Sequence, residues 1–329
     1  MVLILGFLFS LIGTMISMRL AIKVGALDYP NAIKIHVSPT PTIGGLGILS
    51  GSIFSSWLLM YLSGDYWNLV LPMIMGSLVI FAVGLIDDLT GLKPIQKITG
   101  QVLAALVYVL MSTHTRIELA VSEFLWVTVL TVGLSNSLNL FDGIDGVLAG
   151  TVAIMALAGS VVARMSSDAY WSIILLTVVG GCLGFLVFNL PPAKTFMGDC
   201  GSLYLGYIFG LAVYRLGFLD LRPTRSVFGW LLIMAVPVCD TVFAIVRRTL
   251  GRSGVLLGDR RHIYDRLCHY LGGNVLKTDL VIWSMTAILS LLGVNMIRNL
   301  DSYWTPVAVI TTYIGLFYIG KALGCLSSD

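Results

Sequence analysis

Long apolar segments separated by short polar connections run through the whole of this 329-residue chain. A helix needs about 20 mainly apolar residues to cross the hydrocarbon core of a bilayer. Eleven segments come close to that length: residues 2–22, 43–62, 69–86, 96–112, 119–135, 147–163, 170–190, 201–217, 227–246, 279–296 and 303–320. We therefore predict an all-α, polytopic integral membrane protein with about eleven transmembrane helices.

The composition agrees with this prediction. Hydrophobic residues make up 57% of the chain and charged residues 11%, whereas a soluble domain averages about 25% charged residues. The mean hydropathy is +0.93. No tract suggests a separate soluble domain, so we treat residues 1–329 as a single transmembrane domain. The first segment lacks the basic start and small-residue cleavage site of a signal peptide, and we expect it to be retained.

Lysine and arginine predict the orientation, because cytoplasmic loops are enriched in them. If the amino terminus lies outside, the inner loops hold Lys23, Lys34, Lys93, Lys97, Lys194, Arg247, Arg248, Arg252, Arg260, Arg261, Arg266 and Lys277. The outer loops then hold only Arg116, Arg164, Arg215, Arg222, Arg225 and Arg298. This asymmetry predicts an outer amino terminus and a cytoplasmic carboxyl terminus. It also accounts for the net charge of +3, which therefore gives no reason to expect nucleic-acid binding.

The most polar interruption is NSLNLFDGIDG at residues 136–146, between two apolar segments. It places Asn136, Asn139, Asp142 and Asp145 three residues apart, so consecutive members would share a helix face. Ionisable groups at membrane depth cost roughly 2.5–3.5 kcal/mol each on insertion scales, which makes them candidates for function. The alternative is a polar re-entrant turn that caps its neighbouring helices. Four such side chains with two glycines favour a binding site.

A pair of acids, Asp87 and Asp88, ends the third apolar segment. Adjacent carboxylates repel each other and a helix carboxyl end disfavours anions, so packing alone explains the pair poorly. Lys97, at the start of the next segment, could supply a compensating charge or bind a phosphate.

Asp199 stands just before another apolar segment, in FNLPPAKTFMGDCGS at residues 188–202. Alone, it is typical of a helix N-cap with Ser202 nearby. A helix amino terminus is also a natural site for an anion or a metal-bound phosphate.

The basic stretch DRRHIYDRL at residues 259–267 contains Arg261 and His262. A solvated cytoplasmic loop explains part of this charge, but arginine side chains also bind phosphates well. Lys34 and His36 are further candidates on the predicted cytoplasmic side.

The glycine-rich stretch at residues 39–51 lacks the strand–turn–helix setting of a dinucleotide site. Its Gly47 and Gly51 fit close packing between membrane helices. The five cysteines have no CxxC spacing and indicate neither a disulfide framework nor a zinc site.

Several acids, an amide and basic residues on one predicted face suit a divalent metal and a multiply charged phosphate ligand. Mg²⁺ prefers oxygen ligands and is usually held by one or two protein groups together with substrate phosphates. A site at the lipid–water boundary lets a water-soluble phosphate compound meet a lipid one. The pattern therefore predicts phosphoryl transfer at the inner leaflet.

In their order along the chain, these motifs resemble the polyprenyl-phosphate N-acetylhexosamine-1-phosphate transferases of glycosyltransferase family 4. The resemblance includes DYPNAIKIHVSPTPTIGG and PVCDTVFAIVRR, and covers about residues 28–267. It implies eleven transmembrane helices, Mg²⁺ dependence with Mn²⁺ as a substitute, and an active site on the cytoplasmic face of the inner (plasma) membrane. The implied reaction moves N-acetylhexosamine-1-phosphate from a UDP-sugar to undecaprenyl phosphate or another polyprenyl phosphate and releases UMP.

The resemblance also implies roles for individual residues. Asn139 and Asp199 match the positions that hold Mg²⁺ on the donor pyrophosphate. Asp87 and Asp88 match a pair implicated in catalysis and in handling the lipid phosphate. The other matches are substrate-binding positions: Lys97, Arg261 and His262 near the phosphates, Asn189 and Phe196 near the uracil, and Asp142 and Asp145 in the family's acidic loop.

The stretch around His262 has one histidine where the branch that transfers phospho-MurNAc-pentapeptide carries a cluster. The chain therefore looks more like the branch that initiates teichoic acid, O-antigen (lipopolysaccharide) or other surface polymers. The pentapeptide transferase is the alternative within this class. A secondary transporter is the alternative of another class, but it would place polar groups near the midplane with internal repeats.

The expected partners are a UDP-N-acetylhexosamine (UDP-N-acetylglucosamine being the family's commonest donor), polyprenyl phosphate and the lipid bilayer, without nucleic acid; a homodimer is an open option. We expect a single displacement, in which the lipid phosphate oxygen attacks the sugar-linked phosphorus and Asp87 or Asp88 orients the acceptor or removes its last proton. A covalent aspartyl-phosphate is the competing mechanism.

Overall fold

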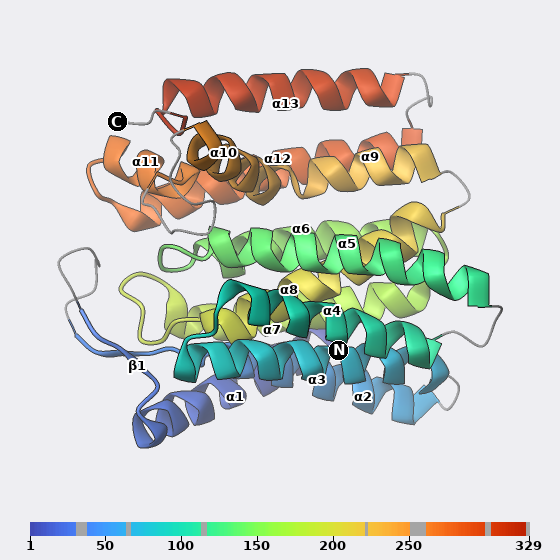
Figure 1. Cartoon of the computed structure of the whole chain (residues 1–329), viewed down its shortest axis with the longest axis horizontal. Helices are drawn as coiled ribbons and strands as arrows, with labels where there is room; N and C mark the ends of the chain where they lie inside the picture. Colours follow the sequence, from blue (N-terminus) through green and yellow to red (C-terminus); the bar gives the residue numbers. More distant parts are fainter. Residues whose placement is uncertain are drawn as a thin grey trace.

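The computed structural model describes residues 1–30, 38–63, 67–112, 117–220, 223–250, 261–299 and 304–326. In these ranges the chain forms thirteen α-helices, one π-helical turn and a two-stranded ribbon, with most helices running along one axis (Figure 1). The elements are α1 Val2–Val24, β1 Leu27–Asp28, β2 Thr40–Pro41, α2 Gly45–Ser63, α3 Trp67–Thr90, α4 Pro94–Ser112, α5 Ile117–Phe141, α6 Val147–Met165, α7 Ala169–Asn189, α8 Gly198–Val213, η1 Tyr214–Phe218, α9 Pro223–Ile233, α10 Ala235–Leu250, α11 Ile263–Tyr270, α12 Val275–Asn299 and α13 Trp304–Ala322. The all-α class predicted from the sequence is confirmed.

Each of the eleven predicted segments coincides with a helix or a pair of helices. Seven of the described helices are long and apolar enough to cross a membrane, or eight if the bent pair of α9 and α10 forms one span. α8 has only 16 residues, and the π-helical turn η1 continues it. The chain is therefore a multi-pass membrane protein, while the number of eleven crossings stays a prediction.

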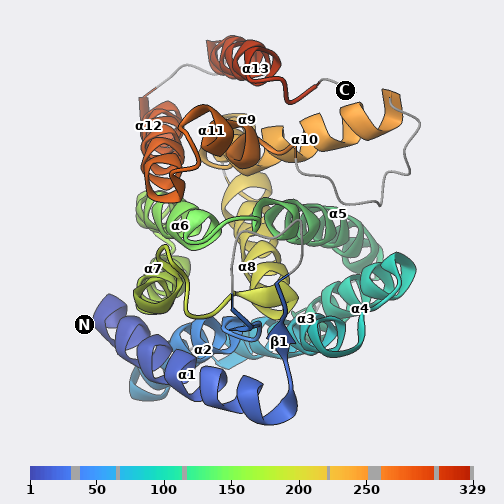
Figure 2. The same ribbon diagram turned by 90° about the vertical axis from the view of Figure 1, so that its left-hand side faces the viewer.

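α8 lies near the centre of the bundle (Figure 2). All of its residues from Cys200 to Val213 are buried, as expected of a helix that is apolar on every side. Glycine allows its closest approach to α5, because a Cβ on Gly206 would overlap the backbone of Ser135. α8 therefore fixes the positions of α3 and α5, which pack against it and carry the polar motifs.

The contact between α1 and α2 confirms the packing role predicted for two glycines. A Cβ on Gly47 would overlap the Thr14 hydroxyl, and a Cβ on Gly51 would lie 2.6 Å from the carbonyl oxygen of Gly6. These residues belong to the architecture of the bundle.

The polar motifs converge at one end of the bundle (Figure 1). α3 and α5 end there, α6, α8 and α12 begin there, and the antiparallel ribbon of β1 and β2 lies alongside. α9 and α10 meet at an angle of 74°. Pro237, in the first turn of α10, has no N–H to donate back to α9, so the helical hydrogen bonding breaks there.

Candidate active site

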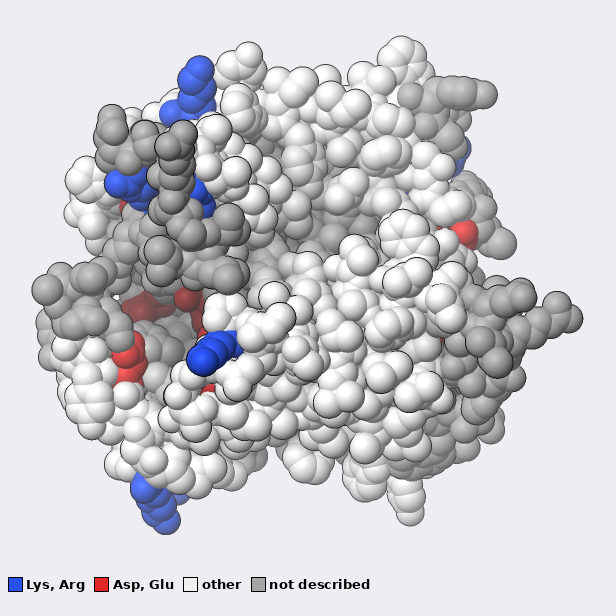
Figure 3. Space-filling view, viewed as in Figure 1, with Lys and Arg blue, Asp and Glu red and all other residues white. Residues whose placement is uncertain are grey.

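A cavity of about 490 Å³ opens at this end of the molecule. Acidic side chains lie inside a hollow near the same end, with a basic side chain at its edge (Figure 3). Residues from β1, β2, α3, α5, the α5–α6 loop, the end of α7, the α7–α8 connection, α8 and the start of α12 line the cavity. Seven of the predicted site residues are among them: Asp88, Asn139, Asp142, Asp145, Asn189, Phe196 and Asp199.

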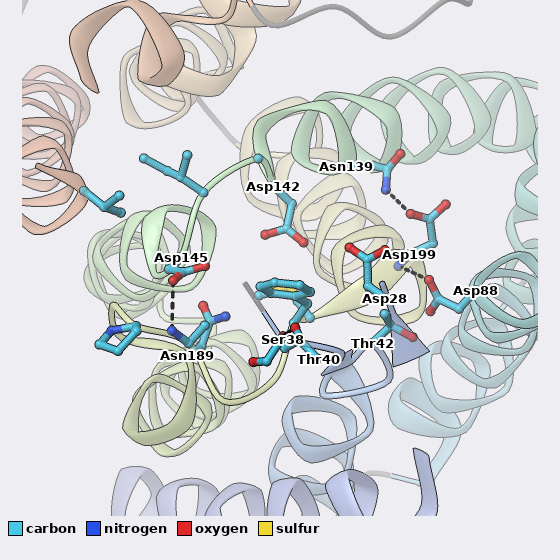
Figure 4. Close-up of a pocket in the computed structure, with 18 residues that line it drawn as sticks. Asp28, Ser38, Thr40, Thr42, Asp88, Asn139, Asp142, Asp145, Asn189 and Asp199 are labelled. Carbon is cyan, nitrogen blue, oxygen red and sulfur yellow. Dashed lines mark hydrogen bonds between the residues drawn. The ribbon is translucent and has the colours of Figure 1, made fainter. Parts of the chain in front are cut away.

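Asp88 at the end of α3 caps the amino terminus of α8 (Figure 4). Its Oδ1 accepts the N–H of Asp199 at 2.8 Å and its Oδ2 accepts the N–H of Cys200 at 3.0 Å. The interpretation of Asp199 as a simple N-cap is therefore wrong, since a carboxylate from another helix caps α8 and Asp199 lies in its first turn. The cap fixes Asp88 against two helix amides, whose dipoles favour an anion.

Gly198 makes this arrangement sterically feasible. Its φ is 72°, in the left-handed region, where residues with a Cβ are strained. A Cβ here would overlap the carbonyl oxygen of Thr42 and would lie 2.6 Å from the Oδ2 of Asp88.

Lys97 at the start of α4 forms ion pairs with both Asp87 and Asp199. Asp87 also accepts the N–H of Leu92 through its Oδ1 at 2.5 Å, and neither Lys97 nor Asp87 lines the cavity. The two adjacent acids of α3 are thus compensated differently, Asp87 by an ammonium and Asp88 by helix amides. The predicted compensating charge on Lys97 is confirmed.

Asn139 stands beside Asp199 in the last turn of α5. Its Nδ2 donates to the Oδ1 of Asp199 at 2.7 Å and to the hydroxyl of Ser202 at 3.0 Å. One turn earlier, Asn136 pairs with Gln101 of α4, with its Nδ2 donating to Oε1 at 2.7 Å. Because α5 ends at Phe141, Asp142 and Asp145 lie in the following loop and not on the helix face that the spacing suggested.

Asp142 projects into the cavity, with Asn139 and Asp199 on one side of it and Asp145 and Asn189 on the other (Figure 4). Burial raises the pKa of this carboxyl to about 8, and the carboxylates of Asp199, Asp88 and Asp145 contribute to the increase. The lining of the cavity in the described residues contains no Lys, Arg or His. A cation would relieve this concentration of negative charge.

Asp145 and Asn189 hold two loops together at the other side of the cavity. Asp145 accepts the N–H of Ala193 at 2.9 Å. Asn189 accepts the N–H of Gly146 at 2.9 Å and donates to the carbonyl oxygen of Thr195 at 2.9 Å. Asn189 therefore positions the α5–α6 loop against the chain that leads into α8.

The ribbon and the turn after it supply lining residues that the site prediction omitted, among them Asp28, Thr40 and Thr42. Their signal in the sequence was the DYPNAIKIHVSPTPTIGG stretch, which was noted without assigning them a role. Lys34 and His36, the candidates from that stretch, lie outside the described residues.

Arg261 and His262 do not line the cavity. His262 is buried, and its Nδ1 lies 2.5 Å from the Oδ2 of Asp240 in α10. Asp240 also accepts the N–H of Ile263 at 2.6 Å, while the carbonyl oxygen of Arg261 accepts from Arg247 at 3.0 Å. This contact ties α11 to α10, and a role near the phosphates stays a prediction for both residues.

The donor set fits a hard divalent cation. Among the described residues, no three His, Cys, Asp or Glu side chains lie close enough to hold a metal by themselves. Mg²⁺ needs no such group, because one or two oxygen ligands and the substrate phosphates suffice. Asp199 and Asn139 supply oxygen atoms beside the acidic cavity, which agrees with that mode of binding.

Comparison with known proteins agrees with the family resemblance of the sequence motifs. The family model for glycosyl transferase family 4 matches residues 70–217. A relative in Bacillus subtilis (strain 168), a probable undecaprenyl-phosphate N-acetylglucosaminyl 1-phosphate transferase, is 36% identical over 287 residues, which cover 80% of this chain and 75% of the relative. A decaprenyl-phosphate N-acetylglucosaminephosphotransferase of Mycolicibacterium smegmatis is 34% identical over 306 residues, covering 82% of this chain and 75% of that protein. A phospho-N-acetylmuramoyl-pentapeptide-transferase of Anoxybacillus flavithermus is 30% identical over 282 residues, covering 78% and 83%.

Proposed function

Because the chain belongs to glycosyl transferase family 4, we propose that it transfers N-acetylhexosamine-1-phosphate from a UDP-sugar to a polyprenyl phosphate and releases UMP. The two relatives at 36% and 34% identity carry names that specify N-acetylglucosamine and a polyprenyl phosphate. The reaction would be the first membrane step of a cell-surface polysaccharide.

The observation that carries this proposal is the arrangement of Asp199, Lys97 and Asn139 beside the cavity. Asp199 joins an ammonium and an amide at the amino end of α8, with Asp88 directly behind it. A pyrophosphate that brings its own divalent cation would meet oxygen ligands and a basic side chain at one place. The cavity then extends toward Asp145, where carboxylate oxygens suit the hydroxyl and N–H groups of a sugar nucleotide.

We assign the Mg²⁺ site to Asp199 and Asn139, with Asp142 facing it across the cavity. When bound there, the ion would neutralise charge on the pyrophosphate as UMP departs. Lys97 would contribute positive charge from the opposite side of Asp199. This assignment makes Mg²⁺ the expected cofactor, with Mn²⁺ as a substitute.

A single displacement agrees with the contacts of the acid pair. Both oxygens of Asp88 accept backbone N–H groups, and Asp87 is paired with Lys97. Carboxylates held by donors in this way are weak nucleophiles, which argues against an aspartyl-phosphate intermediate. A lipid phosphate is already largely ionised near pH 7 and needs no general base. Asp87 and Asp88 would instead orient the acceptor phosphate and the groups that donate hydrogen bonds to it. Acid quench of a single turnover is expected to trap no phospho-aspartate.

The proposal also includes the compartment. The excess of lysine and arginine in the loops at the cavity end argues for the cytoplasmic face of the plasma membrane. UDP-sugars are water-soluble and would enter from that side, while the lipid phosphate would reach the same end of the bundle from the inner leaflet.

Release of UMP by the purified protein in detergent tests this proposal. The assay contains Mg²⁺, undecaprenyl phosphate and a panel of UDP-N-acetylhexosamines, together with UDP-MurNAc-pentapeptide. Asp199→Ala is expected to lower the rate by about 100-fold or more, because it removes the metal ligand and leaves Lys97 with one fewer partner. Asp168→Asn, at the opposite end of α7, is the matched control and should keep the wild-type rate.

Release that depends on lipid and Mg²⁺, with an N-acetylhexosamine donor, is the expected result. Activity with UDP-MurNAc-pentapeptide alone would favour the pentapeptide transferase. No release from any donor, in protein that remains folded, would contradict the transferase and favour a transporter.

A further inference from the structure

Asp279 is a buried acid that the proposed reaction does not use. It lies near the start of α12, is 0% exposed, and neither of its carboxylate oxygens has a hydrogen-bond partner among the described residues. A carboxylate buried in this way is costly unless nearby dipoles or charges compensate it. Its surroundings must therefore explain its presence.

The carboxylate of Asp279 faces the start of α6. A Cβ on Gly146 would lie 2.9 Å from the Oδ2 of Asp279. Gly146 is the residue before α6, with φ 80°, and as a glycine it has no side chain to cap the helix. The N–H groups of a first helical turn carry partial positive charge, so an acidic side chain placed beside them favours this position of the helix end.

The turns of α12 before and after Asp279 also lie at the start of α6 or at the cavity. Trp283, one turn after Asp279, donates its indole N–H to the carbonyl oxygen of Val147 at 3.3 Å, and a Cβ on Gly150 would overlap its ring. Val275, one turn before Asp279, lines the cavity. One face of α12 thus supports the first turn of α6 and reaches the cavity wall.

The loop that enters α6 carries Asp142 and Asp145. On one side this loop is held by the α7–α8 connection, through the bonds from Ala193 to Asp145 and from Gly146 to Asn189. On the other side stands Asp279, whose carboxyl group lies beside Gly146 at the end of this loop. The carboxylate of Asp145 points toward Ala193 at the side of the cavity (Figure 4).

We propose that Asp279 is a positioning residue for the sugar-nucleotide end of the cavity, acting through the first turn of α6 and the loop that carries Asp145. The inference rests on the proposed function, because it assigns the Asp145 side of the cavity to the donor substrate. It does not involve the acceptor, whose phosphate would be handled at the Asp87–Asp88 side.

Asp279→Asn tests this inference, because it keeps the size of the side chain and removes its acidic group. We expect the Kd of the UDP-sugar, measured by equilibrium binding with Mg²⁺, and its KM to rise about tenfold. The KM of the polyprenyl phosphate and kcat should stay within about twofold of wild type. Trp283→Phe removes the bond to Val147 while keeping an aromatic ring, and should raise the same donor Kd by a smaller factor. Asp168→Asn should change none of these constants.

A donor Kd that stays unchanged in Asp279→Asn, or a loss of Tm with equal weakening of both substrates, would overturn the inference and leave the proposed function intact. If Asp279→Asn does not fold, an unchanged donor Kd in Trp283→Phe would overturn it. Wild-type protein that neither binds nor consumes any UDP-N-acetylhexosamine would refute the proposed function and this inference with it.

Discussion

The carboxylates around the cavity are compensated in different ways. Asp87 pairs with Lys97, Asp88 accepts two helix amides, and Asp145 accepts a loop amide. Asp142 instead faces three other carboxylates. The residues with compensation are held in place before any ligand binds, while the neighbouring carboxylates disfavour the ionisation of Asp142.

The stability of the metal-free protein should therefore fall as pH rises. The pKa of Asp142 is about 8 in the folded protein and 3.8 for an ordinary aspartate. Between these values the folded state keeps a proton that the unfolded chain has released, so raising the pH disfavours folding until about pH 8, where the dependence ends. One such proton corresponds to about 1.4 kcal/mol per pH unit.

Thermal unfolding in detergent with a chelator, measured between about pH 6 and pH 8.5, checks this expectation. Asp142→Asn cannot ionise and should make the decline in Tm shallower. An equal decline in wild type and variant would show that another group is responsible.

At the scale of elements, the α8 amino terminus depends on one glycine. Gly198→Ala would force an unfavourable left-handed conformation, at about 1–2 kcal/mol, and would displace Asp88 or Thr42. Because Asp88 then loses its place on the amides of α8, we expect UMP release to fall by about 100-fold.

Gly133→Ala is the matched control for that substitution. Gly133 lies within α5, and a Cβ added there would meet no other described atom within 4 Å. Alanine should therefore leave the rate unchanged and stabilise the helix slightly. Wild-type rates in Gly198→Ala would mean that the cap is dispensable.

The pairing of α10 with α11 gives a second prediction at this scale. His262→Ala leaves Asp240 buried without its imidazole partner, and breaking a buried pair costs about 3–5 kcal/mol. We expect a lower Tm, with little change in the donor KM of the protein that stays folded. The reverse result, a raised KM with an unchanged Tm, would support the role near the phosphates that the family resemblance implied.

The helices were predictable from the sequence, but their ends and the loops were less so. Apolar length located the helix or helix pair for all eleven segments, because membrane-length runs leave few alternatives. The regular spacing of Asn136, Asn139, Asp142 and Asp145 suggested a continuing helix, but α5 ends at Phe141. Spacing alone does not reveal that the helix stops before Asp142 or that Gly146 leads into the next one.

At the scale of the whole molecule, the orientation can be tested with reporter fusions. The loop charges predict an outer amino terminus and a cytoplasmic carboxyl terminus. Green fluorescent protein fused after residue 326 should fluoresce, and alkaline phosphatase inserted in the turn between α6 and α7 should be active. The opposite pattern would place the cavity on the outer face and contradict the use of a cytoplasmic UDP-sugar.

The sequence predicted most of the residues that line the site, but it did not predict which of them contact one another. Seven of the predicted residues line one cavity, because acids and amides in membrane segments tend to face one another. Long-range partners could not be read from the chain: the cap that Asp88 makes on α8 joins residues 111 positions apart. The ribbon residue Asp28 was missed because a single aspartate in a loop carries no spacing signal.

The position of Lys97 predicts how a cation would reach the proposed site. The ammonium of Lys97 lies between Asp87 and Asp199. It therefore compensates the charge of both acids and holds them together when no ligand is bound. A bare metal ion must compete with this tethered charge. A metal that comes attached to a pyrophosphate offers the ammonium new anionic partners in exchange, and we therefore expect the protein to take up the metal–nucleotide complex as one ligand.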